Sequence, residues 1–171
     1  GTIMSLTYGD DFKDKLTIEN TNQYFGLFQS ETNLIYADYL SLPATTLTTD
    51  CYYYMFKGCS NLVYAPTILP ATTLATECYF HMFQGCTKLV NAPALPAETL
   101  ADACYYYMFN GCTSLVNAPA LPATTLDTYC YCNMFGGCTS LVTAPELPAT
   151  TLKNNCYRNM FNGCSKLNYI K

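Results

Sequence analysis

Apolar residues recur at every fourth position in a short segment of the chain. The residues that share this spacing are Leu47, Cys51, Met55 and Cys59. Such a stripe is typical of a short amphipathic helix of about two and a half turns. Gly58 would end this helix, because glycine readily adopts the left-handed conformation that closes a helical C-terminus. The pattern therefore predicts a short helix that ends at Gly58.

A short apolar run follows the predicted helix. The run Leu-Val-Tyr-Ala at residues 62–65 is too short for a helix, and Pro66 after it cannot donate to a strand ladder. Pro66 and Pro70 make the segment between them extended and stiff. Each unit is therefore predicted to consist of a short strand, an extended turn and a helix.

The same pattern returns along nearly the whole chain. Its leading prolines fall at positions 43, 70, 96, 122 and 148, which gives one step of 27 residues and three of 26. A degenerate copy precedes them, with Tyr24 lying 28 residues before its counterpart Tyr52. Fixed periods of this length indicate stacked repeats. We predict an N-terminal cap with one degenerate repeat over residues 1–41 and five tandem repeats over 42–171, in one continuous domain.

Stacking buries faces that one unit cannot bury alone. The expected fold class is an α/β repeat, a right-handed solenoid with a short parallel sheet on one face and short helices on the other. Positions that keep one residue type in all five copies are predicted to be buried, and positions that drift are predicted to be solvated. The column of Tyr52 is expected to be half-buried, with its hydroxyl groups outward.

Composition removes several function classes. Eight Lys and Arg against twelve Asp and Glu give a net charge of -4, and no basic run occurs, so nucleic acid is not an expected partner. No apolar stretch approaches the roughly 18 residues of a membrane-spanning helix. The first fifteen residues do not resemble a signal peptide, so we expect any export signal to lie outside this sequence.

The repeat core resembles a known family. The tract Met-Phe-x-Gly-Cys-x-x-Leu-Val-x-Ala-Pro-x-Leu-Pro resembles the BspA-like leucine-rich repeats of bacterial surface proteins, and residues 24–171 follow its phase. The matching positions of one copy are Phe56, Cys59, Leu62 and Ala65. An added Cys-Tyr-x-x before the Met-Phe pair departs from the family pattern. The resemblance implies a leucine-rich-repeat solenoid, a secreted or surface location in anaerobic bacteria, and a role in adhesion or host interaction.

The eleven cysteines allow three interpretations. Disulfides suit an exported protein, but Cys51 and Cys59 would lie roughly 12 Å apart along a helix, beyond disulfide reach. Zinc is disfavoured because Cys130 and Cys132 are too closely spaced for a ligand pair and His81 is the single histidine. We favour a column of small buried thiols that fill the core, with no disulfide and no metal.

No catalytic constellation can be assigned. The carboxylates of Asp50, Glu77, Asp102 and Asp127 precede the repeating cysteines at differing offsets, so they fix no pair. His81 is interpreted as a solvated surface histidine without a partner. A nucleophile or general base needs an orienting partner, so we expect no enzyme activity and no cofactor.

Variable positions are the binding candidates. Two adjacent columns on the helical side hold Tyr53, Phe80 and Tyr106, and Tyr54, His81 and Tyr107. The variable column of the strand, expected to point outward, holds Tyr64, Asn91, Asn117, Thr143 and Tyr169. Exposed aromatic residues of this kind suit a glycan-stacking or protein-contact patch. The alternative is that they serve only repeat packing.

These observations predict a non-catalytic extracellular or cell-surface interaction module for adhesion or for binding a host protein or glycan. The alternative is a structural spacer that holds another domain away from the cell and has no ligand of its own. The sequence stops inside the strand of its last repeat, so we expect either that the native protein continues or that this uncapped end packs on another copy.

Overall fold

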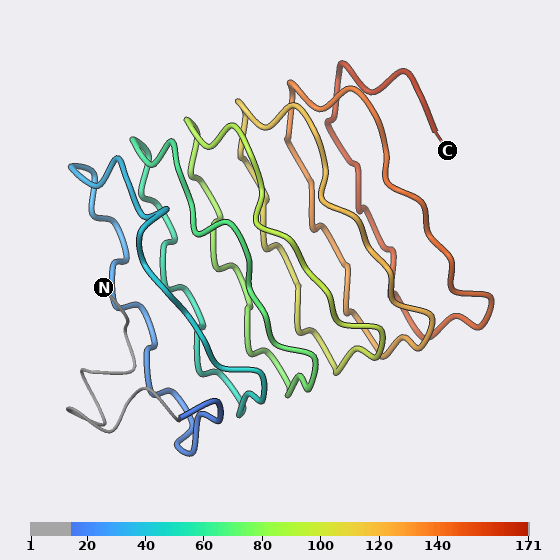
Figure 1. The fold of residues 1–171 in the computed structure, drawn as a ribbon. Helices are drawn as coiled ribbons and strands as arrows, with labels where there is room; N and C mark the ends of the chain where they lie inside the picture. The colour runs from blue at the N-terminus through green and yellow to red at the C-terminus, as the bar shows by residue number, and fades with distance from the viewer. Residues whose placement is uncertain (1–14, 171) are drawn as a thin grey trace.

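The chain winds into rungs that lie side by side in one stack. The structure is a computed structural model, and it describes residues 15–170. Figure 1 shows the rungs following one another from the N-terminal to the C-terminal end. We number them as first to sixth in the order 15–41, 42–68, 69–94, 95–120, 121–146 and 147–170. Residues 1–14 of the predicted cap and residue 171 lie outside the described residues.

The segment predicted to be a helix is a succession of tight turns instead. No residue from 15 to 170 is in an α-helix, so the prediction of a helical side is wrong. Residues 49–58 are turns throughout, and the N–H of Met55 donates to the carbonyl of Tyr52 at 3.2 Å. This bond spans three residues, as in a β-turn, whereas an α-helical bond spans four.

Alternate N–H groups of the same segment bond the next rung. The N–H of Tyr54 donates to the carbonyl of Phe80 at 3.0 Å. Two residues further on, the N–H of Phe56 donates to the carbonyl of Met82 at 2.9 Å. The backbone therefore divides its donors between turns within one rung and bonds to the following rung, and both sets are obligatory partners for buried polar groups.

Every fourth residue of this ribbon of turns is left-handed. Asp50, Tyr54 and Gly58 have φ angles of 56°, 58° and 76°. Tyr54 is the third residue of the turn that Met55 closes, where a positive φ is the mark of a type II turn. Side chains alternate in pairs, so that Met55 and Phe56 are buried and the two residues on either side are half-buried. The four-residue spacing of the buried residues therefore reflects the repeat of the turns and not the pitch of a helix.

The predicted continuous sheet is reduced to isolated parallel bridges. One line of bridges joins Tyr36, Tyr64, Asn91, Asn117, Thr143 and Tyr169 in neighbouring rungs. A second line joins Thr17, Thr46 and Thr73, and then Thr99 and Thr125. Equivalent positions thus lie side by side in parallel, without strands of consecutive paired residues. The right-handed sense of the coil stays a prediction.

The invariant positions make the core, in columns that run through the stack. The rings of Tyr52 and Tyr79 stack at 5.6 Å, and those of Phe56 and Phe83 stack at 5.3 Å. Tyr52 and Tyr79 are fully buried, so the expectation of a half-buried tyrosine column is wrong at these rungs. Each rung repeats the same inward side chains, and offset stacking of like rings stabilises the column beyond the area it buries.

Backbone conformation at one column predicts a pair of opposite stability changes. Gly111 has a φ of 75°, and an added Cβ would meet only the Cα and N of Gly85, both at 3.8 Å. Space is sufficient, so Gly111→Ala should cost about 1–2 kcal/mol through the left-handed backbone alone. The exposed Ser30 occupies this column in the first rung with a φ of 63°, so Ser30→Gly should gain about 1 kcal/mol.

Urea denaturation of the unmodified protein and of these two variants measures both changes in the free energy of unfolding. Ser60→Gly is the matched control, because Ser60 is absent from the positive-φ residues among 15–170 and should lose about 0.5–1 kcal/mol. Changes in the free energy of unfolding that have the same sign for Ser30→Gly and Ser60→Gly would contradict the turn geometry.

Candidate functional site

The first candidate aromatic column forms an unbroken stack. Phe25 continues it into the first rung, and the centroid distances are 5.0 Å from Phe25 to Tyr53, 4.5 Å from Tyr53 to Phe80 and 4.8 Å from Phe80 to Tyr106. The ring planes are within 12° of parallel. Stacked neighbours cover the ring faces, so the surface of the column consists of ring edges. A sugar ring stacks on an open aromatic face, and this column offers none between its ends.

The second candidate column is packed against the first. His81 stacks on Tyr107 at 4.7 Å and meets Tyr54 edge to face at 5.4 Å. The ammonium of Lys57 lies 4.1 Å from the ring centroid of Tyr54, as in a cation–π contact. All of these aromatic residues of the second to fourth rungs are half-buried. The structure therefore brings the six predicted residues together, as a packed aromatic surface with few open faces.

His81 is not the solvated histidine that the sequence suggested. Its Nδ1 lies 2.6 Å from Oε1 of Gln84, and it is half-buried among aromatic rings. Burial lowers the pKa of His81 to about 4, against a smaller opposing contribution from Gln84. The imidazole is therefore neutral at pH 7 and can donate its Nδ1–H to Gln84.

Titration of this single histidine is a direct test. The folded pKa lies below the ordinary value of 6.5, so protons bind the unfolded chain more tightly, and stability should fall as pH drops from about 6.5 to 4. His81→Tyr, which copies Tyr54 and Tyr107, should show less of this loss. The Hε1 resonance of His81 should titrate near 4 in an NMR series, and a midpoint near 6.5 would contradict the burial argument.

All eleven cysteines are free thiols in the structure, and all but Cys164 are buried. The thiol of Cys86 lies 3.1 Å from the carbonyl oxygen of Phe56 in the preceding rung, and Cys112, Cys138 and Cys164 repeat this contact at 3.1 Å. The column of Cys59 thus serves as a set of small S–H donors between rungs. Within residues 15–170, no cluster of three His, Cys, Asp or Glu side chains could hold a metal ion.

Burial also predicts slow thiol chemistry. It raises the pKa of Cys59 to about 11 and that of Cys51 to about 12, so thiolate is scarce at pH 8.5. Iodoacetamide should modify the half-buried Cys164 first and the other thiols far more slowly. In guanidinium without reductant, mass spectrometry should count close to eleven labels. Fewer labels, or equal native and denatured rates, would contradict a column of buried thiols.

One carboxylate pair was missed by the sequence analysis. Asp50 and Glu77 hold equivalent places in neighbouring rungs, and their carboxyl groups lie close enough to influence each other's pKa. Burial raises the pKa of both groups, and the charges of Asp50 and Asp102 raise that of Glu77 further. The conclusion that no carboxylate pair is fixed was therefore wrong. The signal was their separation of 27 residues, which is the step between the second and third repeats.

The predicted outward column does face solvent. The exposed fraction is 48% for Tyr64 and 59% for Tyr169, Asn91 and Asn117 are exposed, and Thr143 is half-buried. Tyr36, which the sequence analysis missed, is 63% exposed and stacks on Tyr64 at 5.3 Å. We call the six bridged residues from Tyr36 to Tyr169 the outward column. The preceding position of each rung supplies a second, partly apolar column, with Ile35, Val90 and Val116 exposed.

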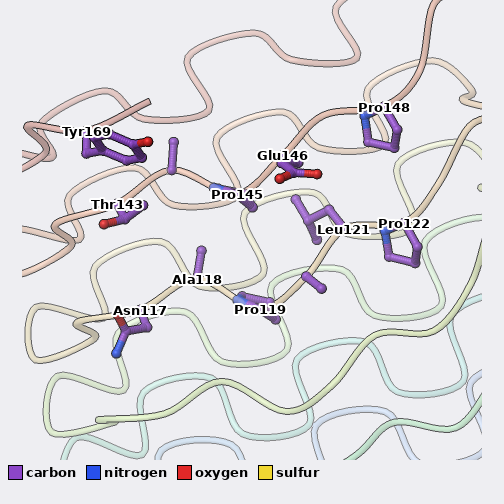
Figure 2. A pocket seen from close by; sticks show the side chains of 12 residues that line it. Asn117, Ala118, Pro119, Leu121, Pro122, Thr143, Pro145, Glu146, Pro148 and Tyr169 are labelled. Carbon is purple, nitrogen blue, oxygen red and sulfur yellow. The ribbon is translucent and has the colours of Figure 1, made fainter. Parts of the chain in front are cut away.

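A groove of about 770 Å³ opens beside the C-terminal half of the outward column. Its walls are residues 117–122 of the fourth and fifth rungs and residues 143–146 and Pro148 of the fifth and sixth, and Tyr169 stands at one end. Figure 2 shows Pro119 and Pro122 on one segment and Pro145 and Pro148 on the other. Its volume lies within the range of about 300–1,000 Å³ typical of ligand sites. No pattern in the sequence predicted this groove.

Comparisons with known proteins give one structural neighbour. No protein-family model and no curated protein matches the chain. The chain is similar to a leucine-rich repeat protein from Bacteroides ovatus whose crystal structure is known, with 20% identity and a TM-score of 0.36. The match covers 75% of this chain and 37% of the other, so the chain spans little more than a third of that protein. The repeat architecture of this chain rests on the pairing of its rungs.

A transmembrane segment was not expected from the sequence. Among residues 15–170, no helix has the length and apolar character needed to cross a membrane.

Proposed function

We propose that the chain is a non-catalytic interaction module of the leucine-rich-repeat kind, secreted or held at a bacterial cell surface, and that it binds a protein in adhesion or host contact. The observation that carries the proposal is the outward column, which has exposed tyrosines at both ends, Tyr36 and Tyr169, and an exposed apolar column beside it. Tyrosine supplies large contact area at low entropic cost and is enriched in binding hot spots.

The division between fixed and variable positions supports this proposal. Residues that are identical in all five copies, such as Met55 and Phe56, form the core, whereas Tyr64, Asn91 and Thr143 differ while holding equivalent places in the stack. A scaffold of this kind changes its surface without changing its core. The resemblance of the repeat core to the BspA-like family supports the proposed secreted or surface location.

A protein partner is favoured over a glycan. The stacked columns of Tyr53 and Tyr54 leave few ring faces open, so sugar stacking there is weakened. The outward column has wider exposure, and its mixture of Tyr, Asn and Thr beside valines resembles the mixed polar and apolar surface of protein interfaces.

Substitutions in the outward column test the proposal. The whole chain is applied to an array of immobilised host matrix proteins and glycans, and bound partners are measured by surface plasmon resonance. Tyr64→Ala and Asn91→Glu should each weaken binding to a protein partner at least about tenfold, because they lie at the centre of the surface. Thr72→Glu adds the same charge at another exposed position and should leave binding unchanged.

Three results would contradict the proposal. Binding confined to glycans would show that the partner is not a protein. Equal losses of affinity for Thr72→Glu and Asn91→Glu would show that the outward column is not part of the interface. The absence of binding to any array member would favour the alternative of a structural spacer.

A further inference from the structure

The groove lies among the later rungs, whose proline segments are not hydrogen-bonded to one another. In the second and third rungs the proline segments are bonded, since the N–H of Leu69 donates to Ala94 at 3.0 Å and that of Ala94 donates to Thr67 at 2.9 Å. Among the described residues, no such bond joins segments 118–123 and 144–149 to each other. Two neighbouring extended segments therefore run past one another with free backbone groups.

The free groups are those that a strand ladder uses. In the part of the chain that the structure describes, the N–H groups of Ala120, Leu121, Glu146 and Leu147 make no backbone hydrogen bond. The carbonyls of segment 118–123 likewise accept none. Unpaired donors and acceptors on an extended segment are a template for another extended chain. A peptide backbone can pair with such groups one by one.

The lining adds chemical selectivity. Pro119, Pro122, Pro145 and Pro148 are rigid and lose no conformational entropy when a ligand covers them. Glu146 is the one charged residue of the twelve that line the groove, and it forms no ion pair within residues 15–170. An exposed carboxylate with no cation of its own complements a basic side chain on an incoming segment.

We propose that this groove binds an extended peptide segment of a partner protein, with a Lys or Arg side chain of the segment placed against Glu146. The peptide carbonyls accept from whichever of the free N–H groups of Ala120 and Leu121 faces the groove, and the peptide N–H groups donate to the free carbonyls of segment 118–123. The peptide side chains pack on the prolines and on Tyr169. Binding of this kind is strand addition to an exposed edge. The inference deepens the proposed function and rests on it, because Asn117, Thr143 and Tyr169 belong both to the groove and to the outward column.

The probes are two fluorescein-labelled pools of heptapeptides, randomised except for a central Lys in one and a central Glu in the other. Fluorescence anisotropy with the whole chain should detect binding of the Lys pool over the Glu pool. Individual binders are then resynthesised with N-methyl groups on alternate amides, which removes backbone donors and keeps every side chain. These peptides should bind at least about tenfold more weakly, since several backbone hydrogen bonds are lost.

Variants at Glu146 separate the contribution of its charge to peptide binding from the contribution of the backbone hydrogen bonds. Glu146→Gln should weaken the Lys peptides up to about fivefold, as expected for an exposed ion pair, and Glu146→Lys should reverse the preference between the pools. Glu98→Gln is the matched control, because Glu98 is also exposed and lies outside the groove lining. In ¹⁵N spectra, the amide signals of Ala120, Leu121, Glu146 and Leu147 should shift on binding.

The outcomes distinguish this inference from the proposed function. Equal binding of N-methylated peptides, an unchanged preference in Glu146→Lys, or no binding of either pool would overturn the peptide site. If an array protein still bound through Tyr64 and Asn91 in that case, the interaction module would stand without the groove. If peptides bound the groove while the outward-column variants kept full affinity for every partner, the groove would stand and the wider interface would fall.

Discussion

The fold depends on how the backbone divides its hydrogen-bond donors. In the ribbon of turns, one N–H closes a turn within its own rung and the next reaches a carbonyl of the following rung, as Met55 and Phe56 illustrate. A helix satisfies all of its donors internally and needs a neighbour only for its side chains. In this fold, about half of the N–H groups in each ribbon of turns have no hydrogen-bond acceptor without the next rung. Stacking is thus an obligation of the backbone, and burial of the aromatic columns adds to it.

This obligation explains which side chains can vary. Donors and acceptors must stay in register through the stack, so each inward position meets its own copy above and below. Tyr52 stacks on Tyr79, and Cys86 donates to the carbonyl of Phe56 while its own copy, Cys112, donates to Phe83. Replacing one member of a column leaves two neighbours without their match. Outward positions lack this constraint, so function in such a protein is confined to the surface columns.

Much of this was readable in the sequence, and the part that was not has a physical reason. The period, the rung boundaries and the buried columns follow from self-similarity alone. The spacing of four was mistaken for a helix, although each step of four advances a helix about 40° beyond a full turn, so Cys59 would lie about 120° from Leu47. The turns were also difficult to predict, because several of their left-handed positions hold Tyr54, Glu77 and His81 in place of the usual glycine or asparagine.

The groove could not be predicted from the sequence for a related reason. It arises because neighbouring segments are not hydrogen-bonded to each other, and no residue type indicates this. Pro66 and Pro70 are four residues apart, and the segment between them, which includes Ile68, bridges the next rung. Later prolines, such as Pro119 and Pro122, are three apart, and proline has no N–H to give. Shortening the segment by one residue removes a donor and shifts the register of those that remain. The residue that the second repeat has and the later repeats lack is therefore the difference that coincides with the open edge. A surface able to accept a foreign strand arises where neighbouring repeats do not pair with each other.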